Sequence, residues 1–425
     1  MRTILACSTF IGMVSCSSNN EKPQNSTSDF CTTSQLRPSR YKLFEIVQEL
    51  KALTATIKDP APKAIYAIPG HWSAFFVAPK AGFEAAKQEE GFSGEFKAAC
   101  NIGDATCVQD QIQLVNELTD GDPSNGEADA MGIGCKSATE MVPVITEAVK
   151  NTPVITFDSD VATPLLAGRH LYLGTMNLPA GYDAGQTMLG LLNSAGTVHI
   201  YAQSFAPQNA AERAAGVFEA CLNTTFASAA DFLASPYCAL LNTDHICKAE
   251  CSAESARGLT IMAHAYADEF AADLTWIGNH ANATAEDYLA DSVATLTQSG
   301  SPPVGVMSLQ GTPGPVLLKV VGNRVKNDDM YFVAWDLSAE IQAGLDDGSV
   351  NAAMVQNSYF YGYVTAHIAY AMAVAGVPSV MNVLEKYFVP NNEDKLIDTG
   401  VTVVTAENLP FYLKYQVECL GLTTG

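Results

Sequence analysis

Residues 64–89 read AIYAIPGHWSAFFVAPKAGFEAAKQE and predict the unit from which the fold is built. An apolar run typical of a β-strand (64–68) is followed by a Pro-Gly turn and then by a helical pattern from about residue 74. The same order continues, with further strands expected at 95–99, 128–133 and 153–157. Strands that alternate with helices are typical of an α/β fold with a doubly wound parallel sheet.

A second series of the same kind begins near residue 172. After a first strand at 171–173, strands are expected at 197–202, 274–277, 304–308 and 331–335, with helices between them. The sequence therefore predicts two lobes of like order. In such folds a ligand binds between the units, beyond the carboxyl ends of the strands.

The charge balance excludes several classes of partner. The 425 residues contain 23 Lys and Arg against 45 Asp and Glu, a formal net charge of −22. Affinity for nucleic acid comes from basic side chains that neutralise phosphates, and docking on an anionic membrane surface needs a basic patch. We expect no nucleic-acid partner, and we expect most of the acidic side chains to face solvent.

The N-terminus predicts export. An apolar run at 4–14 is too short to span a bilayer but fits the core of a signal peptide. Ser15 and Cys16 follow, and then a polar stretch, which resembles a bacterial lipobox with Cys16 as the acylated residue. An ordinary cleaved secretory signal is the alternative. The apolar stretch 363–381 contains Thr365, His367 and Pro378 and is expected to be a buried helix, so membrane contact is expected only through the lipid anchor.

Export makes disulfides the expected state of the cysteines. Nine of the eleven cysteines remain after Cys7 and Cys16 are set aside. We expect bridges between Cys100 and Cys107, within the group Cys221, Cys238, Cys247 and Cys251, and between Cys31 and Cys419, which leaves Cys135 unpaired. The stretch 221–256 then becomes a disulfide-stapled insertion. A zinc site on His245, Cys247 and Cys251 is a weaker alternative because no paired CxxC spacing supports it.

No catalytic or cofactor motif is present in the sequence. It lacks a phosphate-binding GxxxxGK[ST] loop, an HExxH helix and a GxSxG elbow, and Gly132-Ile133-Gly134 lacks the third glycine of a dinucleotide fingerprint. A nucleophilic Cys135 has no histidine near it in sequence. We therefore predict a binding protein rather than an enzyme, with no cofactor and no metal.

Polar and aromatic side chains follow the predicted strands, where the ligand crevice of an open α/β sheet lies. The candidate binding residues are Ser73, Phe75, Phe76, Asp158, Gln310, Asp336 and Gln356. Aromatic faces together with carboxylates and amides suit a neutral ligand with many hydroxyl groups. Alternatives stay open: one of the two phenylalanines could belong to the core, and Asp158 and Asp336 could each cap a following helix.

Several of these segments resemble, in the same order, the periplasmic sugar-binding proteins of ABC importers, the ribose/galactose-binding family. SAFFVA at 73–78 is similar to the family's Asn-Pro-Phe-Phe segment, and PVITFD at 153–158 is similar to its Pro-Val-Ile-x-x-Asp. QNAAERAAG at 208–216 matches a helix opening with Arg-x-x-Gly, and VAWD at 333–336 matches Val-x-Phe-Asp. The resemblance covers about residues 62–415 apart from the insertion. An arginine common in the binding helix falls on Ala211, and Ser73 and Gln310 replace the family's asparagines.

The resemblance implies a type I periplasmic binding fold, with two doubly wound parallel-sheet lobes joined by a hinge of three crossovers near residues 174, 356 and 396. The expected organisation is a signal peptide with lipobox (1–16), a tether and N-terminal extension (17–60), an N-terminal lobe (61–173 plus 357–395) and a C-terminal lobe (174–356 plus 396–425), with the insertion at about 221–256.

The implied function is that of a monomeric solute-binding lipoprotein in the periplasm or at the cell surface. It would capture a small molecule, expected to be a sugar, by hinge closure and deliver it to an ABC permease. Phe75 and Phe76 would face the sugar ring, and Asp158, Gln310, Asp336 and Gln356 would bond its hydroxyl groups. A sensory module for a receptor kinase or chemoreceptor and a carrier of an apolar ligand are the alternatives.

Overall fold

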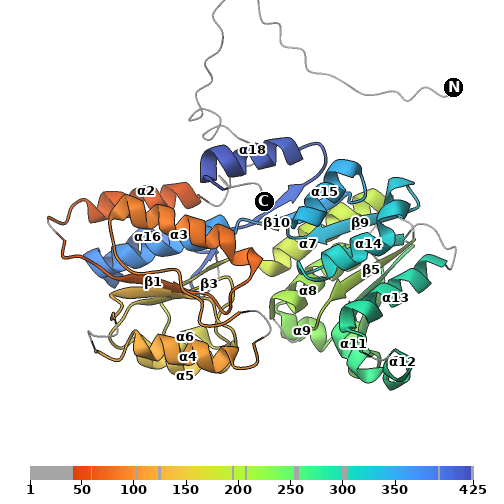
Figure 1. The fold of residues 1–425 in the computed structure, drawn as a ribbon, viewed down its shortest axis with the longest axis horizontal. Coiled ribbons are helices and arrows are strands. Elements are labelled where there is room, and N and C mark those ends of the chain that lie inside the picture. The colour runs from red at the N-terminus through yellow and green to blue at the C-terminus, as the bar shows by residue number, and fades with distance from the viewer. Residues whose placement is uncertain are drawn as a thin grey trace, which may run out of the picture.

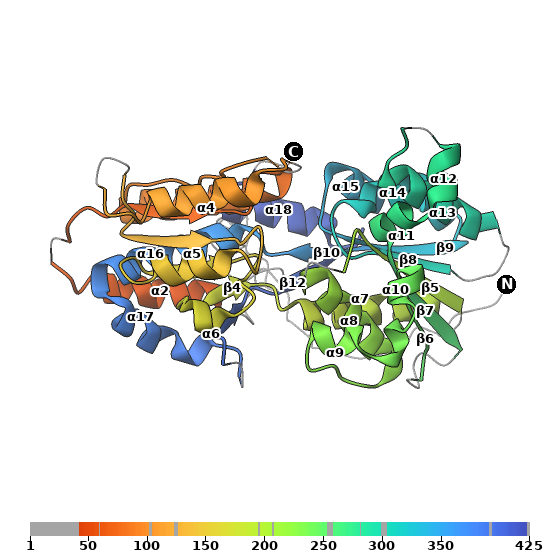
Figure 2. The ribbon, with the colours of Figure 1, turned by 90° about the horizontal axis from the view of Figure 1, so that it is seen from below.

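The computed structural model describes residues 42–422 except 59, 102–103, 123–125, 194–195, 206–207, 253–257, 281, 299–303 and 391–392. The chain forms two lobes side by side, each with a mainly parallel sheet between layers of helices (Figures 1 and 2). The predicted doubly wound α/β fold is confirmed. Cys16, the signal peptide and the tether up to residue 41 lie outside the described residues.

The N-terminal lobe contains a five-stranded parallel sheet. Its order is β1 (Ile65–Ile68), β2 (Ala130–Ile133), β3 (Val154–Phe157), β4 (Tyr172–Gly174) and β11 (Leu396–Asp398). One face packs against α2 (Leu43–Thr54), α3 (Val77–Glu90), α16 (Tyr359–Ala375) and α17 (Val377–Leu384). The other face packs against α4 (Cys107–Glu117), α5 (Met141–Ala148) and the short α6 (Pro164–Ala167). Because helices cover both faces, the strands are apolar on both sides.

The expected strand at 95–99 does not form. This segment pairs with β1 through the isolated bridge of Phe96 with Ala67, and a second bridge joins the preceding residue Ser93 to Ala64. Gly94, at φ +104°, bends the backbone, and the residues after it include no β-branched side chain. A helix that the sequence analysis did not predict, α2, lies in the N-terminal extension and packs on this lobe.

The C-terminal lobe contains a seven-stranded sheet. Its order is β12 (Val401–Val404), β10 (Ala352–Gln356), β9 (Met330–Trp335), β8 (Val304–Ser308), β5 (Gly196–Ala202), β7 (Leu259–Ala265) and β6 (Ile246–Glu250). Only β12 and β6 run antiparallel to their neighbours among the described strands. The helices α7 (Asn177–Leu192) and α8 (Gln208–Leu222) pack on one face, and α11 (Tyr266–Ala272), α13 (Ala285–Gln298), α14 (Pro313–Lys326) and α15 (Ala339–Asp347) pack on the other.

The strand expected at 274–277 is wrong, because these residues begin α12 (Leu274–Asn279). Asp273 caps this helix, since its side chain accepts a hydrogen bond from the Trp276 N–H. The strand of this part of the sheet is instead β7, in a stretch that the sequence analysis left irregular. In β7 the alternate residues from Leu259 to Ala265 are buried on the α8 side, as the pleat of a strand requires.

Three connections join the lobes. The chain passes from β4 to α7, from β10 to α16 and from β11 to β12. Two of these fall where they were expected, near residues 174 and 356. The third falls after Asp398, because β11 pairs with β4, so residues 396–398 lie with the N-terminal lobe. The last helix, α18 (Leu409–Leu420), packs on both lobes beside these connections (Figure 1).

The cysteines pair within the expected sets. Cys100 pairs with Cys107, Cys221 with Cys251 and Cys238 with Cys247, while Cys135 is buried and unpaired. Cys419 is also bonded, and the expected partner Cys31 lies outside the described residues. The insertion folds as α9 (Ala229–Leu233), the 3-10 turn η4 (Pro236–Cys238), α10 (Leu241–Asp244) and the edge strand β6.

Within the described ranges, none of the helices has the length and apolar character needed to cross a membrane. The stretch 363–381 spans most of α16 and the start of α17, and Gly376 separates the two helices. Both helices pack on the N-terminal lobe, with the buried side chains of α16 in its core.

Candidate ligand-binding site

Each lobe places an aspartate directly after a central strand. Asp158 follows β3 at φ +61°, and Asp336 follows β9 at φ +62°. Residues other than glycine seldom adopt this left-handed backbone, although aspartate tolerates it better than most. Each aspartate thus lies at the carboxyl end of its strand, and the two carboxylates are close enough for their charges to interact.

Arg213 of α8 interacts electrostatically with both aspartates. Its side chain is buried, and three of its five N–H groups donate to protein acceptors. Nε donates to Asn177 Oδ1 (2.9 Å), Nη1 to the Leu309 carbonyl (2.8 Å) and Nη2 to Gln356 Oε1 (3.0 Å). The guanidinium carbon also lies 4.2 Å from the centroid of the Trp335 indole, a cation–π contact. Arg213 is therefore held in one position.

Gln356, at the end of β10, links this arginine to Asp336 and to the hinge. Its Nε2 donates to Asp336 Oδ1 at 3.0 Å, and its Oε1 also accepts from the Tyr361 hydroxyl at 3.1 Å. The Tyr361 hydroxyl lies 2.7 Å from Thr175 Oγ1, on the first connection between the lobes. We call Asp158, Arg213, Asp336, Gln356 and Tyr361 the interlobe site.

Burial and mutual charge set the protonation of this site. Burial raises the pKa of Asp158 to about 7, with Arg213 opposing the rise and Asp336 adding to it. Burial also raises the pKa of Asp336, against the influence of Arg213 and the hydrogen bond from Gln356. Near neutral pH Asp158 is therefore only partly ionised, and the positive charge of Arg213 offsets the negative charge of the site. This balance suits an uncharged ligand.

Three of the predicted binding residues, Asp158, Asp336 and Gln356, come together in this site. Two others lie beside it. Gln310 Oε1 accepts a hydrogen bond from the Gln203 N–H at 3.0 Å. Ser73 is half-buried at the start of a short 3-10 turn. In the described part of the chain, neither of these two side chains bonds to the interlobe site.

The two predicted phenylalanines separate, one into the core and one beside the site. They lie on the 3-10 turn η2 (Ala74–Phe76) before α3. Phe76 is 2% exposed and packs in the core of the N-terminal lobe, with its ring centroid 6.4 Å from that of Phe96. Phe75 is half-buried, and its ring centroid lies 6.1 Å from that of Tyr361. Phe75 is therefore the aromatic candidate, and Phe76 is a core residue.

The capping alternative for Asp336 is wrong. The helix that follows, α15, begins after Ser338, and the hydroxyl oxygen of Ser338 accepts a hydrogen bond from the Ile341 N–H. The carboxylate of Asp336 instead accepts from Gln356.

Sequence reasoning missed Arg213 as a site residue because it aligned the family's arginine with Ala211. Ala211 is buried in the core of the C-terminal lobe, and the arginine two residues later reaches the site. The available signal was the charged residue within the alanine-rich QNAAERAAG stretch. Tyr361 was missed because it lies in an apolar helix whose hydroxyl partners are distant in sequence.

The alternatives of a zinc site and a cysteine nucleophile find no support in the geometry. Cys247 and Cys251 are each paired with another cysteine. Over the described ranges, no group of three or more His, Cys, Asp or Glu side chains is arranged to hold a metal ion. Burial raises the pKa of the Cys135 thiol, which disfavours the nucleophilic thiolate.

Two lobes, three connections and a polar site between the sheets define the class of bilobal binding proteins. The periplasmic binding protein domain matches residues 65–376, and the chain belongs to this family. Members of this family are solute-binding proteins that act outside the cytoplasm and are not enzymes, as the sequence analysis expected. No curated protein sequence matches the chain.

Solved structures share the fold at low sequence identity. A sugar-binding protein of a sugar ABC transporter from Bacillus halodurans is 17% identical with a TM-score of 0.58, covering 82% of this chain and 99% of its own. A solute-binding protein from Burkholderia graminis in complex with D-arabinose is 22% identical (TM-score 0.56; 83% and 98% covered). One from Agrobacterium vitis bound with α-D-tagatopyranose is 17% identical (TM-score 0.57; 82% and 96% covered).

Proposed function

We propose that the chain is a solute-binding protein of an ABC importer and that it captures a neutral sugar at the interlobe site. The observation that carries this proposal is the cluster of Asp158, Arg213 and Asp336 between the ends of the two sheets, in a chain of the periplasmic binding family. The similar proteins that hold D-arabinose and α-D-tagatopyranose support a sugar as the ligand.

The roles of the residues follow from their chemistry. Carboxylates accept hydrogen bonds from sugar hydroxyl groups, the guanidinium donates them, and the exposed part of the Phe75 ring packs against C–H bonds. Hydrogen bonds to charged groups contribute roughly 1.5–3 kcal/mol each, so a few of them supply a micromolar site at about −8 kcal/mol. A site with this charge content disfavours the alternative of an apolar-ligand carrier.

The mechanism is hinge closure. Asp158 belongs to one lobe, and Arg213 and Asp336 belong to the other. A ligand that bonds to both sides stabilises the closed arrangement through contacts that an open arrangement lacks, and this difference drives the population shift. The closed monomer then docks on the permease, with Cys16 as lipid anchor and the paired cysteines oxidised after export.

The first test is a thermal-shift screen of the purified mature chain against D-arabinose, D-tagatose, D-xylose, D-ribose and D-galactose. A bound sugar stabilises the folded state by mass action, by about 2.7 kcal/mol at a concentration of 100 Kd. We expect at least one sugar to raise Tm and the others to leave it unchanged. A panel without any shift would contradict sugar binding.

The second test is calorimetry on Asp336→Ala with the sugar that shifts Tm most. We expect a loss of affinity of at least 100-fold, because the variant loses a buried acceptor and leaves Arg213 with one carboxylate fewer. Asp347→Ala is the matched control, since Asp347 lies at the far end of α15 in an exposed ion pair with Lys326. Equal affinities for the two variants would refute the assignment of the site.

A further inference from the structure

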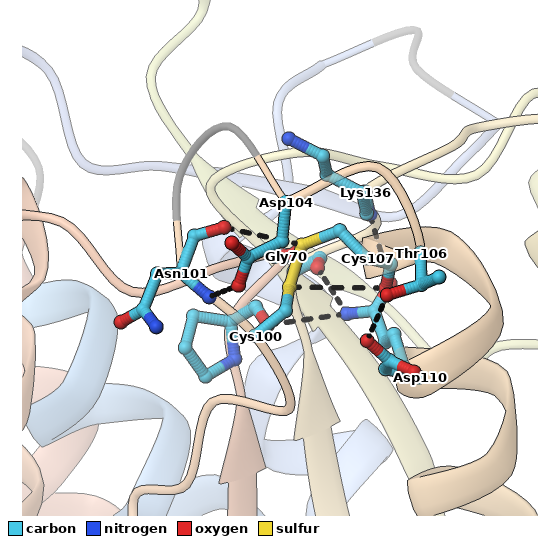
Figure 3. Close-up of a disulfide and its surroundings, with 11 residues drawn as sticks. Gly70, Cys100, Asn101, Asp104, Thr106, Cys107, Asp110 and Lys136 are labelled. Carbon is cyan, nitrogen blue, oxygen red and sulfur yellow. Dashed lines mark hydrogen bonds between the residues drawn. A yellow bond between two sulfur atoms is a disulfide. The ribbon is translucent and has the colours of Figure 1, made fainter.

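The Cys100–Cys107 pair lies at the carboxyl end of β1, beside the loop that leads to Ser73 and Phe75 (Figure 3). Both cysteines are buried, and their Cα atoms are 5.3 Å apart. Their sulfur atoms lie 3.6 and 3.4 Å from the carbonyl oxygen of Gly70, in the middle of this loop. The pair therefore packs against the loop itself rather than against a distant part of the lobe.

Backbone hydrogen bonds join the cysteine pair to the same loop. The carbonyl of Cys100 accepts from the Trp72 N–H at 2.7 Å, and Asn101 forms an isolated bridge with Trp72. Asp104 Oδ2 accepts a hydrogen bond from the Asn101 N–H at 2.8 Å (Figure 3). This bond fixes the segment of Cys100 and Asn101, to which Trp72 is bonded.

Cys107 is the first residue of α4, and the next turn of this helix carries Gln111. Gln111 is fully buried, and its Nε2 donates to the carbonyls of Pro69 (3.3 Å) and Gly134 (2.8 Å). Its Oε1 accepts from the Lys136 N–H at 2.9 Å. One side chain thus clamps the loops after β1 and β2 together, and the disulfide ties this helix to the segment that holds Trp72.

We propose that the Cys100–Cys107 disulfide is a positioning element for ligand binding. It keeps residues 69–73 in the conformation that sets Phe75 beside Tyr361, and its loss lowers affinity by releasing this loop. This inference rests on the proposed function, because the loop matters only if the interlobe site binds a ligand. A binding conformation that is only fractionally populated weakens the apparent affinity by that fraction.

The test compares Cys100→Ser/Cys107→Ser with Cys238→Ser/Cys247→Ser. The control pair lies in the insertion of the other lobe. Calorimetry is done at 25 °C, once thermal unfolding has shown both variants to be folded there, with the sugar that gives the wild type its largest thermal shift. We expect Kd to rise about tenfold in the first variant, which corresponds to a loop that adopts the binding conformation in about one tenth of the molecules. In the control variant we expect Kd to rise less than twofold.

Hydrogen exchange supplies a readout that needs no ligand. We expect faster exchange at the Trp72 amide in the first variant and unchanged exchange there in the control. Gln111→Met keeps the disulfide but removes the clamp, and it is expected to weaken binding and raise exchange in the same loop.

A phosphine reductant should weaken binding by the wild type and leave the Cys100→Ser/Cys107→Ser variant unaffected, and reoxidation should restore the wild type. Unchanged affinity of that variant, or an equal loss in the control, overturns the inference. If the wild type binds no sugar, the proposed function fails, and the exchange at Trp72 alone decides whether the disulfide holds the loop.

Discussion

Replacing Arg213 by methionine is expected to lower the free energy of unfolding by about 3–5 kcal/mol, the usual cost of leaving a buried charge without its counter-charge. The substitution removes three hydrogen bonds and leaves the buried acceptors Asn177 Oδ1 and the Leu309 carbonyl without a donor, while Gln356 Oε1 keeps the hydrogen bond from Tyr361. It also leaves two carboxylates facing each other without a counter-charge. A domain near the middle of the ordinary range of about 5–15 kcal/mol stays folded after such a loss.

The same substitution should raise the pKa of Asp158 above about 7, because Arg213 is the main influence that lowers it. Arg213→Lys keeps the positive charge but lacks the planar fork that reaches three acceptors. The lysine variant is therefore expected to keep the Asp158 pKa near about 7 while still losing sugar affinity. The comparison of the methionine and lysine variants therefore separates the effect of the positive charge from that of the guanidinium geometry.

The assay is urea denaturation followed by tryptophan fluorescence, because Trp335 lies against the guanidinium and reports on its surroundings. Stability is measured from pH 5 to pH 9, and sugar affinity by calorimetry. Arg324→Met, on α14 outside the site, is the control for loss of a positive charge. If Arg213→Met is as stable as the wild type within about 1 kcal/mol and binds sugar equally well, Arg213 does not organise the site.

Three further predictions test the remaining steps. Because burial raises the pKa of Asp158 to about 7, its protonated carboxyl favours the folded state; this contribution is complete below pH 3.8 and is lost as pH rises through about 7. The free energy of unfolding of the wild type relative to Asp158→Asn, measured by urea titration, should therefore fall by up to about 4 kcal/mol across this window. Phe76→Ala should cost about 3–5 kcal/mol of stability, whereas Phe75→Ala should cost less and mainly weaken sugar binding by calorimetry. Gly362→Ala should destabilise by about 1–3 kcal/mol in thermal unfolding, because its Cβ would lie 1.7 Å from the Pro79 carbonyl oxygen, while Gly190→Ala, in open space on α7, should stabilise by up to about 1 kcal/mol.

The order of the elements could be predicted from sequence wherever the hydrophobic pattern is unambiguous. β8 and the strands around it are short apolar runs bounded by turns, and they form as expected. The pattern failed at 274–277, where LTWI resembles a strand in isolation but follows the helix cap Asp273. It failed again at β7, because the stretch before it is an insertion whose fold depends on long-range cysteine pairs.

The site could be predicted only in part, for a related reason. Asp158 and Asp336 directly follow strands and Gln356 ends one, and strand ends are visible in sequence. Arg213 lies in the second turn of a helix, and its three acceptors come from segments 36, 96 and 143 residues away. No local pattern contains that information, because it arises only when the connections between the lobes bring these segments together.

The placement of Arg213 also explains how ligand binding can be coupled to the hinge. Its hydrogen-bond partners Asn177 and Gln356 lie at two of the connections between the lobes, and Tyr361 bonds to both Gln356 and Thr175. A rotation of one lobe against the other changes the distance between Asp158 and this arginine, and so changes the energy of the site. A sugar that replaces water between them would stabilise one lobe arrangement over the other. In the proposed function the charges that act in binding are those nearest the hinge, while most of the net charge of −22 is expected to favour solubility.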